Sequence, residues 1–339
     1  MKRTLLVSLV IILVATLLFA PSVFAQNSSA QSAILMEKTS KRVLWEKNSH
    51  EKLPIASTTK IVTALTVLEN LSNIDQIVEI DKRAVGIEGS SIYLREGEKY
   101  TVRQLLYGLM LQSGNDCAVQ LAITVANNVE NFANLMNLTA KKCGATESNF
   151  VNPHGLHNEN HYSTAYDLAI ITSCALQNEV FSQIVKSKVG DVSLDNPHKI
   201  YNKNKLLKNW EFADGVKTGF TKKAGRCFVG SATKDGMQLV AVVLNCGPMF
   251  EESKSLLEYG FENWKLCCII PQNKMCGVLY NNGKLEYYYC PTALYYPLSK
   301  SEKALIEKDI LLPKNQEDGH ITVSLDKHLI FSQKLVTLD

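Results

Sequence analysis

The feature that most constrains the fold is a change of hydrophobic periodicity along the chain. From Thr101 to Cys143 apolar residues recur at helical spacing, and another helix is expected over Leu168–Cys174 behind a capping-box spacing at Thr164 and Asp167. Beyond Asp214 short apolar runs separated by turn residues replace this spacing. The chain is therefore expected to join a helical region to a β region.

The β region begins with two apolar runs, Cys227–Ala232 and Leu239–Leu244, which predict adjacent buried strands joined by a turn at 234–236. Two short apolar segments near the start of the chain, 33–36 and 42–45, predict a further hairpin. From Cys267 onward the residues become tyrosine-rich and β-prone, so residues 267–339 are expected to form a separate small β domain after a first domain at 26–266.

The first 25 residues have the pattern of a signal peptide. A basic start at Lys2 and Arg3 precedes an apolar run from Leu5 to Ala20, and small residues favour cleavage after Ala25. An uncleaved membrane anchor is the alternative, although the run is slightly short for a span. In both cases the remaining 339 − 25 = 314 residues are expected to be exported. Their length suffices for about two domains.

Charge and cysteine content exclude several partners. The chain has 36 Lys and Arg residues against 33 Asp and Glu residues, so removal of Lys2 and Arg3 with the signal peptide would leave a net charge of 34 − 33 = +1. The sequence also has no basic stripe, so no nucleic-acid partner is expected. The nine cysteines form no CxxC pair and no zinc-type spacing with histidine, so no metal or other cofactor is expected. Their odd number argues against a regular disulfide framework and favours mostly reduced thiols.

Ser57 and Lys60 are the first residues that indicate chemistry. Apolar residues at helical spacing follow directly, so Ser57 is expected in the first turn of a buried helix. Side chains at this spacing share a helix face with Cβ atoms roughly 5 to 6 Å apart, which lets the amine reach the hydroxyl. A lysine acts as a base only when burial or another cation lowers its pKa, and Lys217 is the candidate cation. The pair therefore predicts a nucleophile and its base.

The spacing of this pair is not distinctive by itself. Only Ser57 opens an apolar helix, where backbone N–H groups favour a developing negative charge. Three other pairs share the spacing but lie in loop-like or strand-like sequence: Ser49 with Lys52, Ser231 with Lys234, and Ser324 with Lys327.

A second motif, Ser113–Asn115, lies at the break between two predicted helices and occurs once in the chain. The Ser113 hydroxyl is suited to relay a proton between Lys60 and a leaving amine. The Asn115 amide is suited to hold both a lysine and a substrate carbonyl. A simple helix cap is the alternative for this tripeptide.

A third motif, Lys217–Gly219, begins the β region and also occurs once. A strand edge here would pair with an extended substrate, and Gly219 would let that substrate approach closely. Lys217 and Thr218 supply a cation and a hydroxyl for a terminal carboxylate. An exposed turn is the alternative, but the order of the three motifs is far more specific than any one of them.

The three motifs in this order resemble the SxxK, SDN and KTG signature of class A β-lactamases and penicillin-binding proteins. The flanking residues are similar to the low-molecular-mass penicillin-binding proteins, the serine-type D-alanyl-D-alanine carboxypeptidases. The resemblance covers nearly all of the mature chain and rests on PIASTTK at 54–60, SGNDCA at 113–118, NPHGL at 152–156, YSTAYDL at 162–168 and DGVKTGFTKKAGRC at 214–227.

This resemblance implies an α/β (α+β) serine β-lactamase/transpeptidase-like catalytic domain at 26–266, an antiparallel sheet flanked by helices, followed by a small all-β domain. It implies acylation of Ser57 by the penultimate D-Ala of a peptidoglycan stem peptide, release of D-Ala, hydrolysis by water, and covalent inhibition by β-lactams. It further implies that Lys60 is the general base and that Ser113 and Asn115 line the site. Lys217, Thr218 and Gly219 would bind the substrate end. The backbone N–H groups of Ser57 and Phe220 would form the oxyanion hole.

Two positions depart from the family pattern. Relatives often have an arginine where Tyr166 and Met249 align, so recognition of the terminal carboxylate is expected to fall to Thr218, Lys217 or Arg226. Many relatives also end in an amphipathic membrane helix, which is not expected here. A cleaved signal would then give a soluble or wall-associated enzyme.

Other functions stay open on the sequence. A class A β-lactamase needs a glutamate four residues before an asparagine; Glu130 and Asn134 have this spacing, but they are expected to be surface residues of a helix. A non-catalytic wall-binding or penicillin-sensing protein could keep the fold, and an endopeptidase would act on cross-links.

His154 and His157 are expected to be structural or substrate-lining rather than metal ligands. The oligomeric state and a role in growth or sporulation are not predicted.

Overall fold

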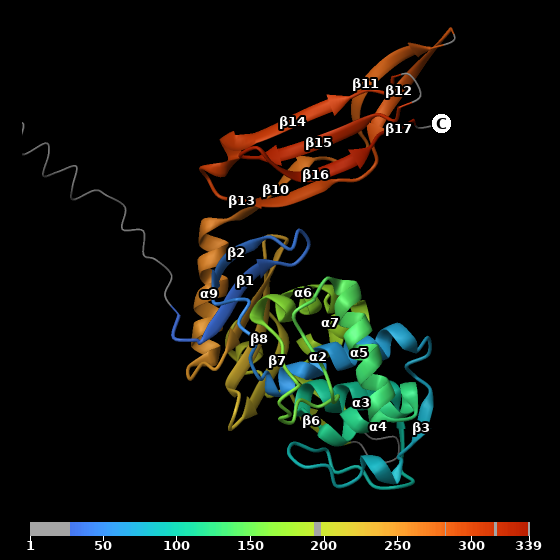
Figure 1. Cartoon of the computed structure of the whole chain (residues 1–339), viewed down its shortest axis with the longest axis vertical. Coiled ribbons are helices and arrows are strands. Elements are labelled where there is room, and N and C mark those ends of the chain that lie inside the picture. The colour runs from blue at the N-terminus through green and yellow to red at the C-terminus, as the bar shows by residue number, and fades with distance from the viewer. Residues whose placement is uncertain (1–27, 193–197, 282, 315–316, 338–339) are drawn as a thin grey trace, which may run out of the picture.

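The computed structural model describes residues 28–192, 198–281, 283–314 and 317–337. The predicted signal peptide, residues 1–25, lies outside the described residues. Figure 1 shows a sheet with helices on both sides and, beyond one end of it, the C-terminal strands in orange and red.

A five-stranded antiparallel sheet in the order β2-β1-β9-β8-β7 forms the centre of the first part of the chain. Both predicted hairpins are confirmed, and Asp235 and Gly236 adopt the left-handed conformation that a tight hairpin turn requires. The strands are β1 (Ser32–Glu37), β2 (Val43–Lys47), β7 (Ala213–Thr221), β8 (Gly225–Lys234) and β9 (Met237–Leu244).

The central residues of the inner strands are mostly apolar on both faces, because both faces of the sheet are covered. In β9, Val240 and Val242 pack into the core beneath the helical cluster, whereas Ala241 and Val243 pack with helix α9 (Met249–Asn263) on the other face. Alternate side chains of a strand point to opposite faces, so a strand buried twice shows no polar alternation.

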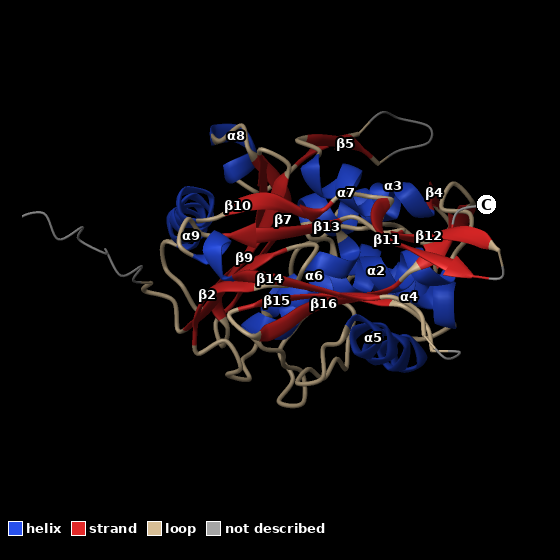
Figure 2. Ribbon diagram, turned by 90° about the horizontal axis from the view of Figure 1, so that it is seen from above, coloured by secondary structure: helices blue, strands red, loops and turns tan. Residues whose placement is uncertain are grey.

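The helical cluster lies on the opposite side of the sheet from α9 (Figures 1 and 2). The helices predicted within 101–143 and over 168–174 are confirmed, and Thr164 caps α6 by accepting from Asp167 N at 3.0 Å. The cluster consists of α2 (Lys60–Asn70), α3 (Val102–Tyr107), α4 (Asn115–Ala126), α5 (Val129–Cys143), α6 (Ala165–Ala175) and α7 (Glu179–Lys186), with the short elements β3 (Ile77–Glu79), β4 (Lys99–Thr101), β5 (Val189–Asp191) and β6 (Lys199–Tyr201). The short helix α8 (Leu206–Asn209) belongs to the other face, because Leu206 and Leu207 share a core with Leu256 and Leu257 of α9.

The C-terminal region is all-β, as expected, and has its own small core around Ile270, Cys290 and Val323. The change of composition at Cys267 falls inside β10, so the boundary between 266 and 267 stays a prediction. The strands are β10 (Lys265–Ile270), β11 (Lys274–Asn281), β12 (Lys284–Cys290), β13 (Leu294–Leu298), β14 (Ile306–Leu311), β15 (His320–Leu325), β16 (His328–Lys334) and β17 (Val336–Thr337).

Arg42, next to β2, holds the C-terminal region against the sheet. Its guanidinium forms an ion pair with Glu302, donates to Pro297 O at 2.5 Å and lies 5.2 Å from the centre of the Tyr296 ring. One side chain therefore makes a charged, a polar and a cation–π contact with the β region.

Within the described ranges, no single helix is long and apolar enough to cross a membrane; only α6 and α7 together reach that length and hydropathy, with a bend of 109° between them. The nine cysteines carry free thiols. The described residues also contain no group of three or more His, Cys, Asp or Glu side chains placed to hold a metal ion.

Candidate active site

Ser57 lies in a 3-10 turn, η1 (Ala56–Thr59), that leads directly into the central helix α2. The prediction that Ser57 opens the α-helix itself was wrong by three residues, because α2 begins at Lys60. The hydroxyls of Thr58 and Thr59 donate back to Ile55 O at 2.6 Å and Ala56 O at 2.8 Å, and these bonds favour the tighter turn. The spacing of Ser57 and Lys60 on one face is kept.

The turn packs against strand β7 at Gly219. A Cβ atom on this residue would lie 3.0 Å from Ser57 N and 3.1 Å from Ile55 O, so glycine allows this close contact between backbones without crowding. The next residue, Phe220, lines the same cavity as Ser57. The KTG motif thus brings the backbone of residues 219 and 220 beside the serine, where the oxyanion hole was expected.

Lys60 is fully buried, and its amine has three neighbours. The Nζ atom lies 3.0 Å from Ser57 Oγ, 2.7 Å from Asn115 Oδ1 and 2.7 Å from His154 O. The first two contacts were expected from the motifs. The carbonyl of His154 was missed, because a backbone contact leaves no residue-type signal in the sequence.

The pKa of Lys60 lies well below the ordinary lysine value, chiefly because burial disfavours the charged amine and secondly because the Lys217 cation repels it. Burial also lowers the pKa of Lys217, to about 7, with a further contribution from the Lys203 cation. The expected influence of Lys217 on Lys60 is therefore present, but it ranks second to burial.

The loop that carries His154 is held against η1 by Gly155. This residue has φ +84°, and a Cβ atom on it would lie 1.9 Å from Ala56 O. His161 adds a second contact, since its Nε2 lies 2.8 Å from Thr59 Oγ1. Burial lowers the pKa of His154 to about 3 and that of His161 to about 4, so both are neutral near pH 7. The NPHGL motif therefore has a structural role in positioning Lys60.

Replacing Gly155 with alanine is expected to destabilise the protein by more than about 2 kcal/mol and to displace His154 O from Lys60, because the methyl group meets backbone that cannot move aside. Thermal unfolding and penicillin labelling would measure the two effects. Gly97→Ala is the matched control, since Gly97 has φ +82° and a Cβ atom on it would meet nothing within 4 Å. Equal losses in both variants would mean that backbone strain, and not the contact with Ala56, explains the effect.

The Ser113–Asn115 motif lies at a helix break, as predicted. Ser113 follows a π-helical turn, η3 (Gly108–Gln112), has φ 65°, and lines the cavity with Ser57. Ser113 is the C-cap residue of η3, but neither Ser113 nor Asn115 caps α4, which has Gly114 at its N-cap and no side-chain capping bond. Asn115 Oδ1 accepts from Lys60, while Nδ2 donates to Glu88 O at 2.5 Å, which leaves one amide N–H for a substrate carbonyl.

Asp116 is a buried carboxylate that sequence reasoning missed. It accepts from Ser91 Oγ at 2.5 Å, from Ile92 N at 3.0 Å and from Leu94 N at 3.2 Å. These bonds fix the loop that carries Ser90, which lines the cavity. An acidic residue directly after the SGN motif, at the start of a mostly apolar helix, was the available signal.

Residues of all three motifs meet in a cavity of about 320 Å³, which is lined by Ser57, Ser90, Ser113, Lys203, Thr218, Gly219, Phe220, Met249 and Phe250. The sequence did not predict Lys203 as a site residue, since it is one of several lysines in the segment 199–208 and no pattern distinguishes it from the others. Its Nζ donates to Gln112 O at 2.7 Å, which orients it at the cavity.

The two departures from the family pattern differ in their position. Met249 lines the cavity, whereas Tyr166 stacks on His50 with ring centroids 4.7 Å apart and is not among the lining residues. The expected effect of Tyr166 on carboxylate recognition therefore has no structural basis. Arg226 lines an adjoining cavity and not the one with Ser57.

The competing sequence patterns lie elsewhere. None of the three other serine–lysine pairs starts a helix: Ser231 and Lys234 lie in β8, Ser324 lies in β15, and Ser49 lies after β2. Glu130 and Asn134 are exposed on α5, as expected for surface residues.

The sheet, the helical cluster and the motifs around Ser57 define the class of serine β-lactamase/transpeptidase-like proteins. Residues 20–247 match the family model described as D-alanyl-D-alanine carboxypeptidase. The chain belongs to this family, and it is a serine-type peptidase.

Individual relatives agree with this membership. The chain is similar to D-alanyl-D-alanine carboxypeptidase DacF of Bacillus subtilis, with 34% identity over 313 residues covering 86% of this chain and 80% of that protein. DacC of Escherichia coli is 38% identical over 266 residues, which cover 72% of this chain and 66% of that protein. The structure of penicillin binding protein 5 from Haemophilus influenzae is 28% identical, with a TM-score of 0.81 and coverage of 94% of this chain and 99% of that chain.

Proposed function

We propose that this chain is a serine D,D-carboxypeptidase that removes the terminal D-Ala from peptidoglycan stem peptides through an acyl-enzyme on Ser57. The observation that carries the proposal is the contact of 3.0 Å between Ser57 Oγ and the fully buried amine of Lys60. A class A β-lactamase is not favoured, because Glu130 and Asn134 are exposed on α5.

The neighbours of Lys60 suit a neutral amine. A neutral amine has two N–H donors and one lone pair. Asn115 Oδ1 and His154 O can only accept, whereas the Ser57 hydroxyl can donate. The two N–H groups are thus directed to the two fixed acceptors, and the lone pair faces the Ser57 O–H group. This arrangement supports Lys60 as the general base.

The proposed reaction has two steps. Lys60 takes the proton of Ser57, whose oxygen forms an ester bond with the penultimate D-Ala while the bond to the terminal D-Ala breaks. The backbone N–H groups of Ser57 and Phe220 would stabilise the oxyanion, and Ser113 would pass the proton from Lys60 to the leaving amine. Water, activated by Lys60, then hydrolyses the ester and restores the enzyme.

The terminal carboxylate has several candidate partners in the cavity. Thr218 supplies a hydroxyl, and Lys203 and Lys217 supply positive charge close to it. Met249, at the position where relatives often have an arginine, adds only apolar surface. We therefore assign carboxylate binding to Thr218 with the two lysines.

The same serine would be acylated by β-lactams, which present a reactive carbonyl to it. Action on peptidoglycan supports a location outside the cytoplasm, and the signal-peptide pattern of residues 1–25 supports export. Residues 26–266 would form the catalytic domain and residues 267–339 the β domain.

Incubation of the purified protein with a muropeptide ending in D-Ala-D-Ala tests the proposal. Mass spectrometry should show the loss of one alanine, and penicillin should block it. A folded protein that yields no product would favour the wall-binding alternative. Cleavage of cross-linked muropeptides without release of terminal D-Ala would favour an endopeptidase.

The pH dependence of kcat/KM is expected to be bell-shaped. Activity falls at low pH, because Lys60 becomes protonated below its lowered pKa and no longer acts as a base. Activity falls again as the pH rises above about 7, because Lys217 with its pKa of about 7 loses the charge that attracts the carboxylate. A peptide ending in D-alaninamide is the control: its profile should keep the acid limb and lose the alkaline limb. An alkaline limb unchanged with this peptide would contradict the role of Lys217.

A further inference from the structure

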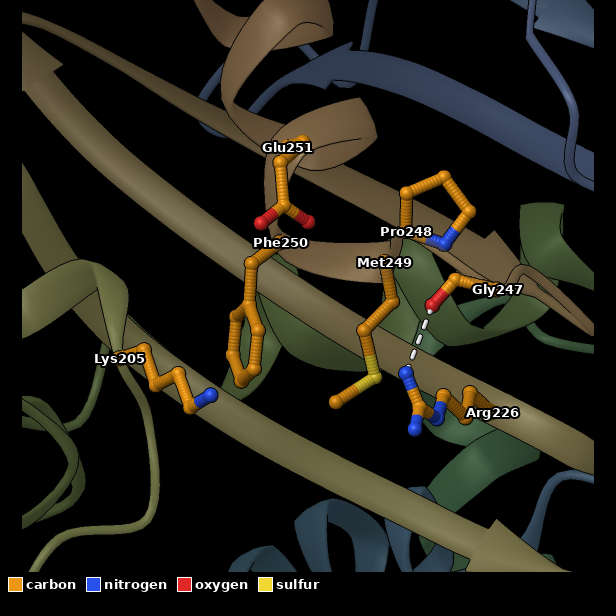
Figure 3. A pocket seen from close by; sticks show the side chains of 7 residues that line it. All are labelled: Lys205, Arg226, Gly247, Pro248, Met249, Phe250 and Glu251. Carbon is orange, nitrogen blue, oxygen red and sulfur yellow. Dashed lines mark hydrogen bonds between the residues drawn. The ribbon is translucent and has the colours of Figure 1, made fainter.

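A second cavity adjoins the one that contains Ser57. It has a volume of about 600 Å³ and is lined by Lys205, Arg226, Gly247, Pro248, Met249, Phe250 and Glu251 (Figure 3). Met249 and Phe250 line both cavities. A ligand that extends past these two side chains would therefore pass from one cavity into the other.

The register of β7 and β8 places the second cavity next to Phe220 and close to Thr218. Arg226 is paired directly with Phe220, so their Cβ atoms are roughly 5 Å apart, and Phe220 lines the Ser57 cavity. Thr218 is paired with Phe228, whose ring packs edge-on against Phe250 at 5.0 Å. The second cavity thus continues the first at the end where the leaving residue is proposed to bind.

Two cations face this second cavity. Arg226 is exposed and donates from Nη1 to Gly247 O at 3.2 Å, which steadies the guanidinium and leaves further N–H donors for a ligand. The Nζ atom of Lys205 lies 6.0 Å from the centre of the Phe250 ring. Figure 3 shows Lys205 and Arg226 reaching toward the cavity from two sides of Phe250 and Met249. Glu251 is the single carboxylate among the lining residues, so positive charge exceeds negative charge.

The terminal D-Ala does not need this space, because its side chain is a methyl group and its carboxylate is already assigned to Thr218 and the two lysines. A larger leaving residue would project its side chain past Met249. A carboxylate on that side chain would meet the guanidinium of Arg226, which is suited to bind a carboxylate through two hydrogen bonds.

We propose that Arg226 and Lys205 form an anion-binding subsite for the leaving residue, so that the enzyme also releases D-residues larger than D-Ala whose side chain carries a carboxylate. This inference rests on the proposed function and extends its substrate class. The chemistry is unchanged: the bond between D-Ala and the leaving residue is replaced by the ester to Ser57, the amine leaves with the proton held by Lys60, and water cleaves the ester.

Three synthetic peptides of the form acyl-D-Ala-X test the subsite, with X as D-Ala, D-Glu or D-Gln. D-Glu and D-Gln have the same shape and differ in charge. We expect kcat/KM for the D-Glu peptide to exceed that for the D-Gln peptide by about 10-fold, which corresponds to about 1.4 kcal/mol. Arg226→Gln should bring this ratio close to one and leave the release of D-Ala unchanged, and Lys205→Gln should reduce the ratio in part.

Lys222→Gln is the matched control, because Lys222 is exposed in the same β7–β8 hairpin and lines neither cavity. It removes the same net charge and should leave the ratio unchanged. The subsite is ruled out if the wild type does not prefer D-Glu over D-Gln, or if Arg226→Gln slows all three peptides equally. If the wild type releases no D-Ala, the proposed function itself fails; normal release of D-Ala without a preference for D-Glu contradicts the subsite alone.

Discussion

Ser57→Ala is expected to abolish both penicillin labelling and the release of D-Ala, with a decrease in kcat of at least about 10⁴-fold. The variant lacks the oxygen that forms the ester. Among the described residues, Ser57 supplies the one hydroxyl that contacts Lys60 Nζ, at 3.0 Å, and the other two partners of this amine are the carbonyl oxygens of Asn115 and His154. The substitution removes one oxygen from a turn held by Thr58 and Thr59, so the fold should remain intact. Fluorescent penicillin binding and D-Ala release would measure the effect.

The chain contains its own control for this experiment. Ser324 precedes Lys327 with the same spacing as Ser57 and Lys60, but it lies in strand β15. Ser324→Ala should therefore keep full labelling and full activity. Labelling of Ser57→Ala at the wild-type rate would show that another residue is acylated and would overturn the assignment.

Lys60→Met is expected to lower the rate of acylation by about 10³- to 10⁴-fold, in the upper range for loss of a general base. Methionine fills a similar volume in the buried site but cannot take the proton of Ser57. Stopped-flow measurement of acylation by penicillin would give the rate, and thermal unfolding would show whether the variant is folded. A folded Lys60→Met protein that acylates at the wild-type rate would exclude Lys60 as the base.

Two further variants sharpen the test of Lys60. Lys60→Arg keeps a cation that is not deprotonated in proteins, so it should be as slow as Lys60→Met. If the arginine variant were active, positive charge and not proton transfer would explain the role of Lys60. Lys327→Met, in the pair with Ser324, is the control and should leave the rate unchanged, because Lys327 lies after β15 in the C-terminal region.

The elements that the sequence predicted best are those with a clear period. The β8–β9 hairpin has long apolar runs and a turn at Asp235 and Gly236, and helix α5 has apolar residues on one face, so both were expected close to their observed positions. Short elements such as β3 and β5 were missed, because three residues are too few for a period. The start of α2 was misplaced, since the hydroxyls of Thr58 and Thr59 favour a 3-10 turn.

Residue types and their spacing along the chain were enough to identify the candidate serine, its lysine and the order of the three motifs. The surroundings of Lys60 could not be predicted in this way, since the contact with His154 O and the packing of Ser57 against Gly219 join backbone segments far apart in the sequence. Burial, which lowers the pKa of Lys60 more than Lys217 does, is likewise a property of the folded core and not of local sequence.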